Sequence, residues 1–278
     1  MNWRAVRALV RRDLLVVRRS RALMIPLVVV PLILLVVAPL VITLLPAFAM
    51  RGDPASAAEL EEMLRTLPPA LRASFGDSPT EQWLHLVHTQ LLPALFLLVP
   101  FLVAQVIAAD GFAGERERKT LEALLYTPLT DGELLGAKLL AALIPAIVVD
   151  VVGFIVSAAT LALGTSMLFG QTLLPDLTWL VLVAWVGPAF AATGLAAMLL
   201  ISLRVRGTQE AIQLGGLLVV PIVVLLISTV RGAIMLGPRT LAIGGALLWL
   251  LASKAADVAT KREIRRQAGF AISLDVPT

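Results

Sequence analysis

The sequence predicts an all-α, polytopic membrane protein built around six transmembrane helices. Hydrophobic residues make up 59% of its 278 residues and charged residues only 15%. In a typical soluble domain about a quarter of all residues are charged. Several apolar runs reach the roughly 20 residues that cross a bilayer as a helix. The runs are continuously apolar and lack the alternation of a lipid-facing strand, so helices are favoured over a β-barrel.

Residues 1–21 are expected to form an amphipathic helix that lies at the membrane interface. Apolar residues recur there at helical spacing, with arginines between them: Trp3, Val6, Val10, Leu14 and Val17. Such a helix places its apolar side at the acyl boundary and its arginines among the lipid headgroups. The alternative, an early start of the first span, is disfavoured by the density of arginine.

Six spans follow within residues 22–256, the predicted transmembrane domain. Their expected bounds are Ala22–Met50, Gln82–Ala109, Leu134–Gly164, Trp179–Ile201, Ala211–Val230 and Thr240–Ala256. The first run is too long for the core of a signal peptide and lacks a small-residue cleavage site, so it is expected to be retained. Past the last span, residues 257–278 form a basic cytoplasmic tail that continues as a charged helix, expected to end at Gly269.

The distribution of Lys and Arg predicts the orientation of the chain. With six spans both termini share one side, and of the 23 Lys and Arg residues only five fall on the other side: Arg51, Arg65, Arg72, Arg231 and Arg239. Because short loops rich in Lys and Arg stay in the cytoplasm, both termini are expected there, in the cell (inner or plasma) membrane. The pI of about 10.1 then reflects charge beside the lipid bilayer, and no nucleic acid is expected as a partner.

Residues 51–81 form the only sizeable external loop. Asp53 before Pro54 is typical of a helix start, and the helix that follows is expected to stop at Pro68–Pro69. Ser78 and Glu81 then make a capping box, which begins the second span. Two short helices in such a loop leave no room for a folded receptor domain.

The cytoplasmic loop at residues 110–133 is charged and proline-broken, although it lies between two apolar spans. The run GERERKTLEALLYTPLTDGELLGAK, residues 114–138, begins within this loop and continues into the third span. A helix over Ala113–Tyr126 is expected to end before Pro128 and to carry an apolar face of Leu121, Leu124 and Leu125. By periodicity alone, these leucines either fold back on the bundle as a hairpin turn or stay exposed until a partner covers them.

After the proline, Thr130 and Glu133 make a second capping box, which restarts a helix that becomes the third span. The pattern GERERKTLEALLYTPLT followed by DGELLGAK resembles the signature of type-2 ABC exporter permeases: a charged run, T-L-E-x-L-L-x-T-P, and a small-residue-rich restart. The motif match covers residues 114–138, and the six-span topology with its N-terminal helix extends the resemblance over nearly the whole chain. The resemblance implies a permease that moves a cation, a drug or a lipid-like substrate outward.

In that family the charged loop is a cytoplasmic coupling helix, which docks into a cleft of an ATPase subunit. The resemblance implies two ATPase copies, a second permease copy, and ATP and magnesium bound by the ATPase rather than by this chain. Carried over residue by residue, the inserted apolar knob is Leu121, Leu124, Leu125 and Pro128, and the charged rim is Glu115, Arg116, Glu117, Arg118 and Lys119. The N-terminal helix is the second expected contact.

Four polar residues lie deep within the predicted spans and are candidates for a transport path: Asp150, Gln105, Gln90 and Gln213. A carboxylate in the hydrocarbon core is costly, so Asp150 is expected to face the bundle interior, a partner or water. It either binds a cation or a proton on a transport route, or makes a structural hydrogen bond or a protonated contact at a dimer seam. The sequence leaves both readings open.

No metal site is predicted, because the chain has no Cys and only two His, His85 and His88. A structural zinc site needs four ligands, so these histidines are expected to serve as anchors at the outer membrane interface.

The chain is not expected to be an enzyme by itself. A phosphate-binding loop needs G-x-x-x-x-G-K-[ST], but Lys119-Thr120 is preceded by Arg118, with Ala113 in the place of the first glycine. An intramembrane enzyme would need a convergent catalytic set, and Asp150 is the only clear acid in the middle of a span. A membrane anchor or assembly factor without transport is the other alternative.

Overall fold

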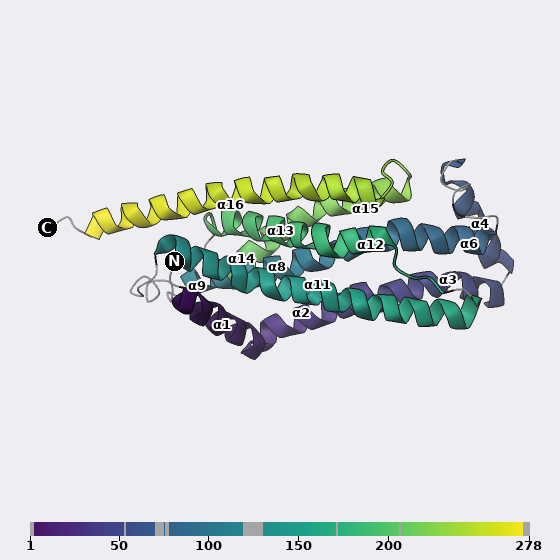
Figure 1. Cartoon of the computed structure of the whole chain (residues 1–278), viewed down its shortest axis with the longest axis horizontal. Coiled ribbons are helices and arrows are strands. Elements are labelled where there is room, and N and C mark those ends of the chain that lie inside the picture. Colours follow the sequence, from purple (N-terminus) through teal and green to yellow (C-terminus); the bar gives the residue numbers. More distant parts are fainter. Residues whose placement is uncertain are drawn as a thin grey trace.

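The computed structural model describes residues 3–52, 54–69, 75, 78–118, 130–170, 172–205 and 207–274. It is 88% helical, and the described residues contain no strand. The long helices run roughly side by side along the longest axis of the molecule (Figure 1). Six of them are long and apolar enough to cross a membrane, with the bounds Arg21–Leu45, Pro79–Gly114, Gly132–Leu168, Leu177–Ser202, Thr208–Thr229 and Pro238–Ala259. The predicted all-α architecture with six spans is therefore confirmed.

The N-terminal helix α1 (Trp3–Arg19) is separated from the first span by Ser20, whose backbone is extended. The span itself consists of α2 (Arg21–Leu32), a π-helical turn η1 (Ile33–Val37) and α3 (Ala38–Gly52). The apolar side of α1 does not lie wholly open to lipid, because Val6 and Leu9 pack against Leu134 and Ala137 at the start of the third span. Helix α1 is thus fixed to the bundle.

The second span is the central helix of the bundle, with 72% of its most apolar window buried. Its parts are α6 (Pro79–Leu86), η2 (Val87–Leu91), α7 (Leu92–Phe96), α8 (Leu98–Ala109), η3 (Asp110–Gly114) and the short α9 (Glu115–Glu117). The Ser78–Glu81 capping box begins it as predicted. Because proline supplies no backbone N–H, Pro93 and Pro100 interrupt the regular hydrogen bonding of this span.

The third span, α11 (Asp131–Phe169), begins at the predicted Thr130–Glu133 capping box. It runs five residues past its expected end at Gly164 and stops at Gly170, whose φ of 65° lies in the left-handed region that favours glycine. The fourth span consists of α12 (Leu177–Val181), the π-helical turn η4 (Leu182–Val186) and α13 (Gly187–Ser202).

The fifth span consists of α14 (Thr208–Gly216), η5 (Leu217–Val219) and α15 (Val220–Val230), and a short turn leads into α16 (Pro238–Leu274). The expectation that the C-terminal helix ends at Gly269 is wrong, because α16 passes through that residue. A single glycine in a helix costs only about 1 kcal/mol, and no proline follows it directly to stop the helix. In the external loop, α4 (Pro54–Arg65) forms as expected, whereas Asp53 lies outside the described residues.

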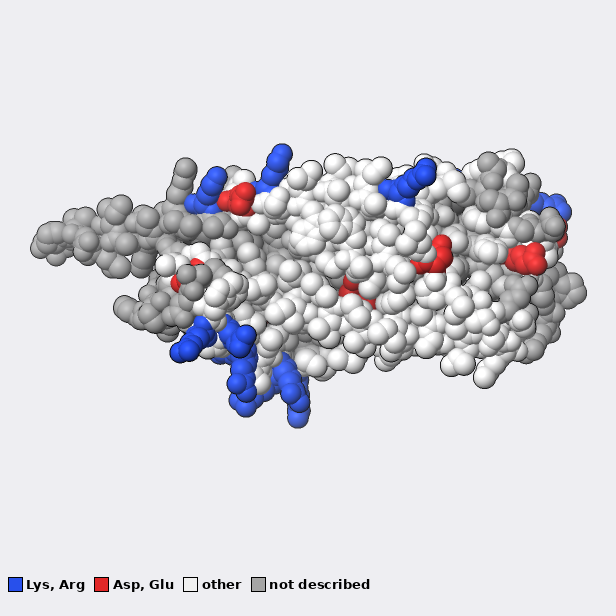
Figure 2. Space-filling view, in the orientation of Figure 1, with Lys and Arg blue, Asp and Glu red and all other residues white. Residues whose placement is uncertain are grey.

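The core of the bundle lies where α13 packs against α8, α11 and α16. Large apolar side chains on α2, α11, α15 and α16 face outward, as Ile25, Ile155, Val224 and Ile243 do. Charged side chains gather toward the two ends, and the long middle of the molecular surface in Figure 2 is largely uncharged. This distribution fits a bundle surrounded by lipid.

Candidate functional site

The charged loop between the second and third spans leaves the bundle through a set of polar contacts, which we call the junction. It contains Arg12 and Asp13 of α1, Asp110 of η3, Glu115 and Glu117 of α9, Arg118, Lys138 of α11 and Thr208 of α14. All lie at the end of the bundle where α1 and α9 are found (Figure 1). The junction brings together segments that are far apart in the sequence.

Lys138 is the buried cation of the junction, with only 3% of its side chain exposed. Its Nζ donates to the carbonyl of Gly111 at 2.9 Å and to Oε2 of Glu115, and it lies 5.8 Å from the centre of the Phe112 ring. Glu115 is itself 9% exposed at its side chain. A buried charge is stable only when it is paired and hydrogen-bonded, and these contacts satisfy that condition for Lys138.

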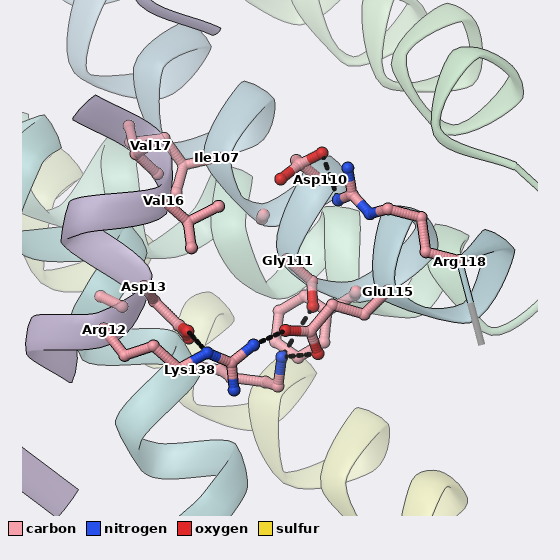
Figure 3. A pocket seen from close by; sticks show the side chains of 13 residues that line it. Arg12, Asp13, Val16, Val17, Ile107, Asp110, Gly111, Glu115, Arg118 and Lys138 are labelled. Carbon is pink, nitrogen blue, oxygen red and sulfur yellow. Dashed lines mark hydrogen bonds and ion pairs between the residues drawn. The ribbon is translucent and has the colours of Figure 1, made fainter. Parts of the chain in front are cut away.

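Arg12 joins the N-terminal helix to the same carboxylate. Its Nη2 lies 3.1 Å from Oε1 of Glu115, and its Nε lies 3.6 Å from Oδ1 of Asp13, as Figure 3 shows. Burial raises the pKa of the Asp13 carboxyl, while nearby Lys138 and Arg12 act in the opposite direction. Both oxygens of Glu115 are therefore held, one by α1 and the other by α11.

Arg118 turns back onto the end of the second span, where its Nη2 lies 2.7 Å from Oδ1 of Asp110. Gly114 lies directly between these groups. A Cβ at position 114 would come within 2.8 Å of the Arg118 guanidinium and 2.9 Å of Thr208 Oγ1. Glycine at position 114 thus leaves room for these side chains, which a larger residue would displace.

Glu117, which belongs to another segment of the chain, caps the N-terminus of the fifth span. Its Oε2 accepts hydrogen bonds from the backbone N–H of Thr208 at 3.0 Å and from Thr208 Oγ1 at 3.1 Å. The N-cap residue of α14 is Gly207, which makes no side-chain cap, so Glu117 satisfies an otherwise open N–H and places its charge at the positive end of the helix. These hydrogen bonds from Thr208 lower the pKa of Glu117 below its ordinary value.

Beside these contacts lies a cavity of about 280 Å³. Its walls combine aliphatic residues of α1 and α8 with the charged groups that Figure 3 shows turned toward one another: Arg12, Asp13, Asp110, Glu115, Arg118 and Lys138. Each of these side chains already takes part in an ion pair. The junction thus acts as a structural connection among four helical segments.

A comparison with known families decides what kind of protein carries this junction. The sequence profile of the family described as "ABC-2 family transporter protein" matches residues 7–264, which is most of the chain. The chain belongs to the ABC-2 transporter family. It is accordingly a membrane permease of an ABC transporter, and the predicted resemblance is confirmed. No curated protein matches the sequence closely enough to add to this assignment.

The residues predicted to contact an ATPase are only partly visible in this ABC-2 permease. Lys119, Leu121, Leu124, Leu125 and Pro128 lie outside the described residues, as does the side chain of Arg116. Among the others, Glu117 and Arg118 are exposed, whereas Glu115 is buried within the junction. Contact of these residues with an ATPase stays a prediction.

Sequence reasoning missed five members of the junction: Arg12, Asp13, Asp110, Lys138 and Thr208. For Lys138 the sequence offered a local signal of its position. Lys138 lies two helical turns after the Thr130 capping box and is therefore on the same restarted helix, close to the charged loop. Arg12 gave no such signal, since its partner Glu115 is 103 positions away in the chain. Only the packing of α1 against α11 places them side by side.

The three glutamines proposed for a transport path of the permease lie in different surroundings. Gln90 is buried, and its Oε1 accepts from the backbone N–H of Leu236 at 2.9 Å. Gln105, fifteen residues further along the span and thus roughly 22 Å away in a straight helix, is buried near Gly215. Gln213 is exposed on α14. A path that joins them to Asp150 stays a prediction.

Asp150, the fourth candidate, is fully buried in the middle of α11. Neither carboxylate oxygen has a hydrogen-bond partner among the described residues. Its Oδ2 lies against Gly187, where a Cβ would overlap it. Asp150 therefore faces α13 across a helix contact inside the chain.

The two histidines of the permease differ from each other. His85 is exposed, but His88 is buried, with its ring 5.5 Å from that of Trp179. Trp179 also meets Phe96 and Phe154 at 5.7 and 6.0 Å. The expectation that both histidines anchor at the interface is therefore wrong for His88, which packs inside an aromatic cluster of the bundle.

Proposed function

We propose that the chain is the membrane subunit of an ATP-driven exporter. A partner ATPase docks on the coupling segment, residues 110–133, and its ATP-driven movement opens a route that carries a cation, a drug or a lipid-like substrate outward. ATP and magnesium are bound by the ATPase. Membership of the ABC-2 family supports this proposal at the level of the transporter class, and the junction supports the role of the segment.

The observation that carries the proposal is the division of contacts between Glu115 and Glu117. Glu115 is held by Lys138 of α11, whereas Glu117, two residues later, is held by Thr208 of α14. The two carboxylates leave the same short segment and reach two different spans. A displacement of the coupling segment would therefore move the third and the fifth spans together.

The far end of the segment is equally well fixed. The Thr130 side chain accepts from the backbone N–H of Glu133, and the Glu133 carboxylate accepts from the backbone N–H of Thr130. A helix start closed on both sides transmits a displacement better than a frayed one. The coupling segment thus enters the bundle through anchored residues at both ends.

The complex that we propose contains two ATPase copies and a second permease copy. Both termini lie in the cytoplasm, and the chain resides in the cell membrane, as the Lys and Arg distribution favours. Helix α1 is the second contact of the ATPase, since Arg12 links it to the coupling segment. Within this arrangement, Glu115 acts as an internal anchor, and the knob of Leu121, Leu124, Leu125 and Pro128 reaches the ATPase.

The docking role is tested by changing the knob. Leu124→Asp combined with Leu125→Asp should abolish co-purification of the ABC ATPase that is recovered with the wild-type chain, because two carboxylates cannot enter an apolar cleft without a large desolvation cost. Membrane insertion should be unchanged. Met63→Asp is the matched control, since Met63 is an exposed apolar residue on α4 at the opposite end of the bundle. Normal ATPase recovery with the double variant would contradict the docking assignment.

A further inference from the structure

Asp150 raises a physical problem that its proposed place on a transport path does not solve. The residue is 0% exposed, and both carboxylate oxygens lack a hydrogen-bond partner among the described residues. Burying an ionised carboxylate without a partner costs far more than burying a neutral polar group, and such groups neutralise instead. Something must therefore compensate the charge of Asp150 or remove it.

No cation among the described residues is hydrogen-bonded to this carboxylate. Helix α11 packs against α1, α2, η1, α3, α8, η4, α13 and α16. Of these elements, η1, α8, η4 and α13 contain no charged residue and no histidine. The other four carry charged residues, such as Arg12, Arg21, Arg51 and Arg239, but none of these makes a hydrogen bond to Asp150.

The surroundings also leave no space for a hydrated ion. Asp150 Oδ2 packs directly on the backbone of Gly187, so closely that a Cβ at that position would overlap it. Asp150 lines neither the cavity at the junction, nor the groove along α1, nor the small cavity beside His88. A proton is the one positive charge that needs no additional volume.

The backbone of the fourth span provides an acceptor for such a proton. Residues Leu182–Val186 form a π-helical turn, in which the N–H of Gly187 donates to the carbonyl of Leu182. The next residue is Pro188, which has no N–H to give. The carbonyls of Val183 and Ala184 therefore receive no hydrogen bond from position 188, and they lie one turn before Gly187 on the same side of the helix.

We propose that Asp150 is a protonated, uncharged carboxyl group that donates its hydrogen to a backbone carbonyl of the π-helical turn before Pro188. The contact between α11 and α13 is then a proton-binding site inside the membrane. The hydroxyl then donates to a carbonyl that receives no hydrogen bond from Pro188, and glycine at position 187 permits the close approach. This inference goes beyond the proposed exporter function and stands whether or not an ATPase docks on this chain.

Infrared spectroscopy of the full chain in lipid nanodiscs at neutral pH tests the proposal. A protonated carboxyl gives a C=O stretching band above the amide region, whereas ionised carboxylates absorb well below it. The lipid esters also absorb in this region, so the protein band is the component that moves when aspartate is labelled with ¹³C. We expect one such component, and it should disappear in Asp150→Asn. Asp13→Asn is the control, because Asp13 is another partly buried acid of the chain, and the band should survive this change.

Two further variants test the acceptor and do not require Asp150 to be changed. Pro188→Ala returns an N–H that competes for the open carbonyls, so the band should move to higher frequency as its hydrogen bond weakens. Gly216→Ala is the control, since a Cβ there meets no neighbour within 4 Å, and it should leave the band in place.

The absence of a ¹³C-sensitive band in the wild-type chain would overturn the proposal even if Asp150→Asn failed to fold. A band that persists in folded Asp150→Asn would overturn it as well. A third contrary result combines two observations: the wild-type chain lacks the band, and sodium or potassium ions stabilise the wild type but not Asp150→Asn. The site would then hold a metal ion instead of a proton.

Discussion

Two buried acids of the same bundle are stabilised in opposite ways. Glu115, at the end of the second span, is held by Lys138 and Arg12 and remains close to the aqueous boundary. Asp150, in the middle of the third span, lies against the backbone of Gly187, and its oxygens have no hydrogen-bond partner among the described residues. The difference teaches that this protein places ion pairs where its helices join the coupling segment, and keeps charge out of the centre of the bundle.

The largest expected effect is at Lys138, the partner of the Glu115 carboxylate. Lys138→Met removes the principal partner of a buried carboxylate, and such a loss costs about 3 kcal/mol of stability; Arg12 keeps the loss from being larger. Unfolding of the purified chain in mixed micelles by a denaturing detergent measures this free energy.

The matched control for Lys138 removes both charges together. Glu115→Leu combined with Lys138→Met leaves no uncompensated charge, and it should recover most of the stability lost in the single variant. If the double variant proves as unstable as Lys138→Met alone, the ion pair is not the cause of the loss.

At the centre of the bundle, the corresponding change is Gly187→Ala. The new Cβ would overlap Asp150 Oδ2, and overpacking of this kind costs about 2 kcal/mol. A second change, Asp150→Ala, should restore the stability by making room. The same unfolding measurement checks both, with Gly216→Ala as a control that should have little effect. A stable Gly187→Ala variant would show that α11 and α13 are not in close contact there.

The two capping boxes allow a smaller and paired test. Thr130→Ala and Ser78→Ala each remove one side-chain cap, and each should cost about 1 kcal/mol of stability. Hydrogen exchange should become faster at the amide that loses its acceptor, which is that of Glu133 in Thr130→Ala and that of Glu81 in Ser78→Ala. Only Thr130→Ala should also weaken ATPase recovery, because Ser78 lies at the opposite end of the bundle. Equal recovery for both variants would argue against a mechanical role of the Thr130 cap.

The smallest expected effect is the pH dependence of the Glu117 cap. Since the two hydrogen bonds from Thr208 lower the pKa of Glu117 in the folded chain, the cap contributes stability above the ordinary carboxylate range. This contribution is lost as the pH falls through the lowered pKa. Hydrogen exchange at the Thr208 amide should therefore quicken at acid pH in the wild type, relative to its neighbours. In Glu117→Gln this extra acceleration should be absent; its persistence would assign the effect to another group.

Local patterns in the sequence predicted much of this structure. The six spans followed from continuous apolar runs, and the starts at Ser78 and Thr130 followed from capping residues three positions apart. Local reasoning failed at Gly269, because glycine alone does not end a helix whose neighbours favour it. The π-helical turns were likewise not predicted, since they depend on how each span packs around its prolines.

The junction was predicted only in part, because its contacts are made between distant segments. Glu115 and Glu117 stood out by their charge, yet the sequence placed them on a rim that faces a partner. Their partners Arg12 and Thr208 are 103 and 91 positions away, and nothing local marks them. Asp150 was recognised as unusual from its position, but its contact with Gly187 required the packing of α11 on α13.

Photo-cross-linking from the coupling segment tests the central claim most directly. A photoreactive benzophenone amino acid replaces Leu124 in one variant and Met63 in another. Each variant is co-expressed with the ABC ATPase that is recovered with the wild-type chain, and the membranes are irradiated. The account predicts a cross-linked permease–ATPase product from position 124 and none from position 63. A cross-link from position 63, or cross-links from position 124 only within the bundle, would contradict it.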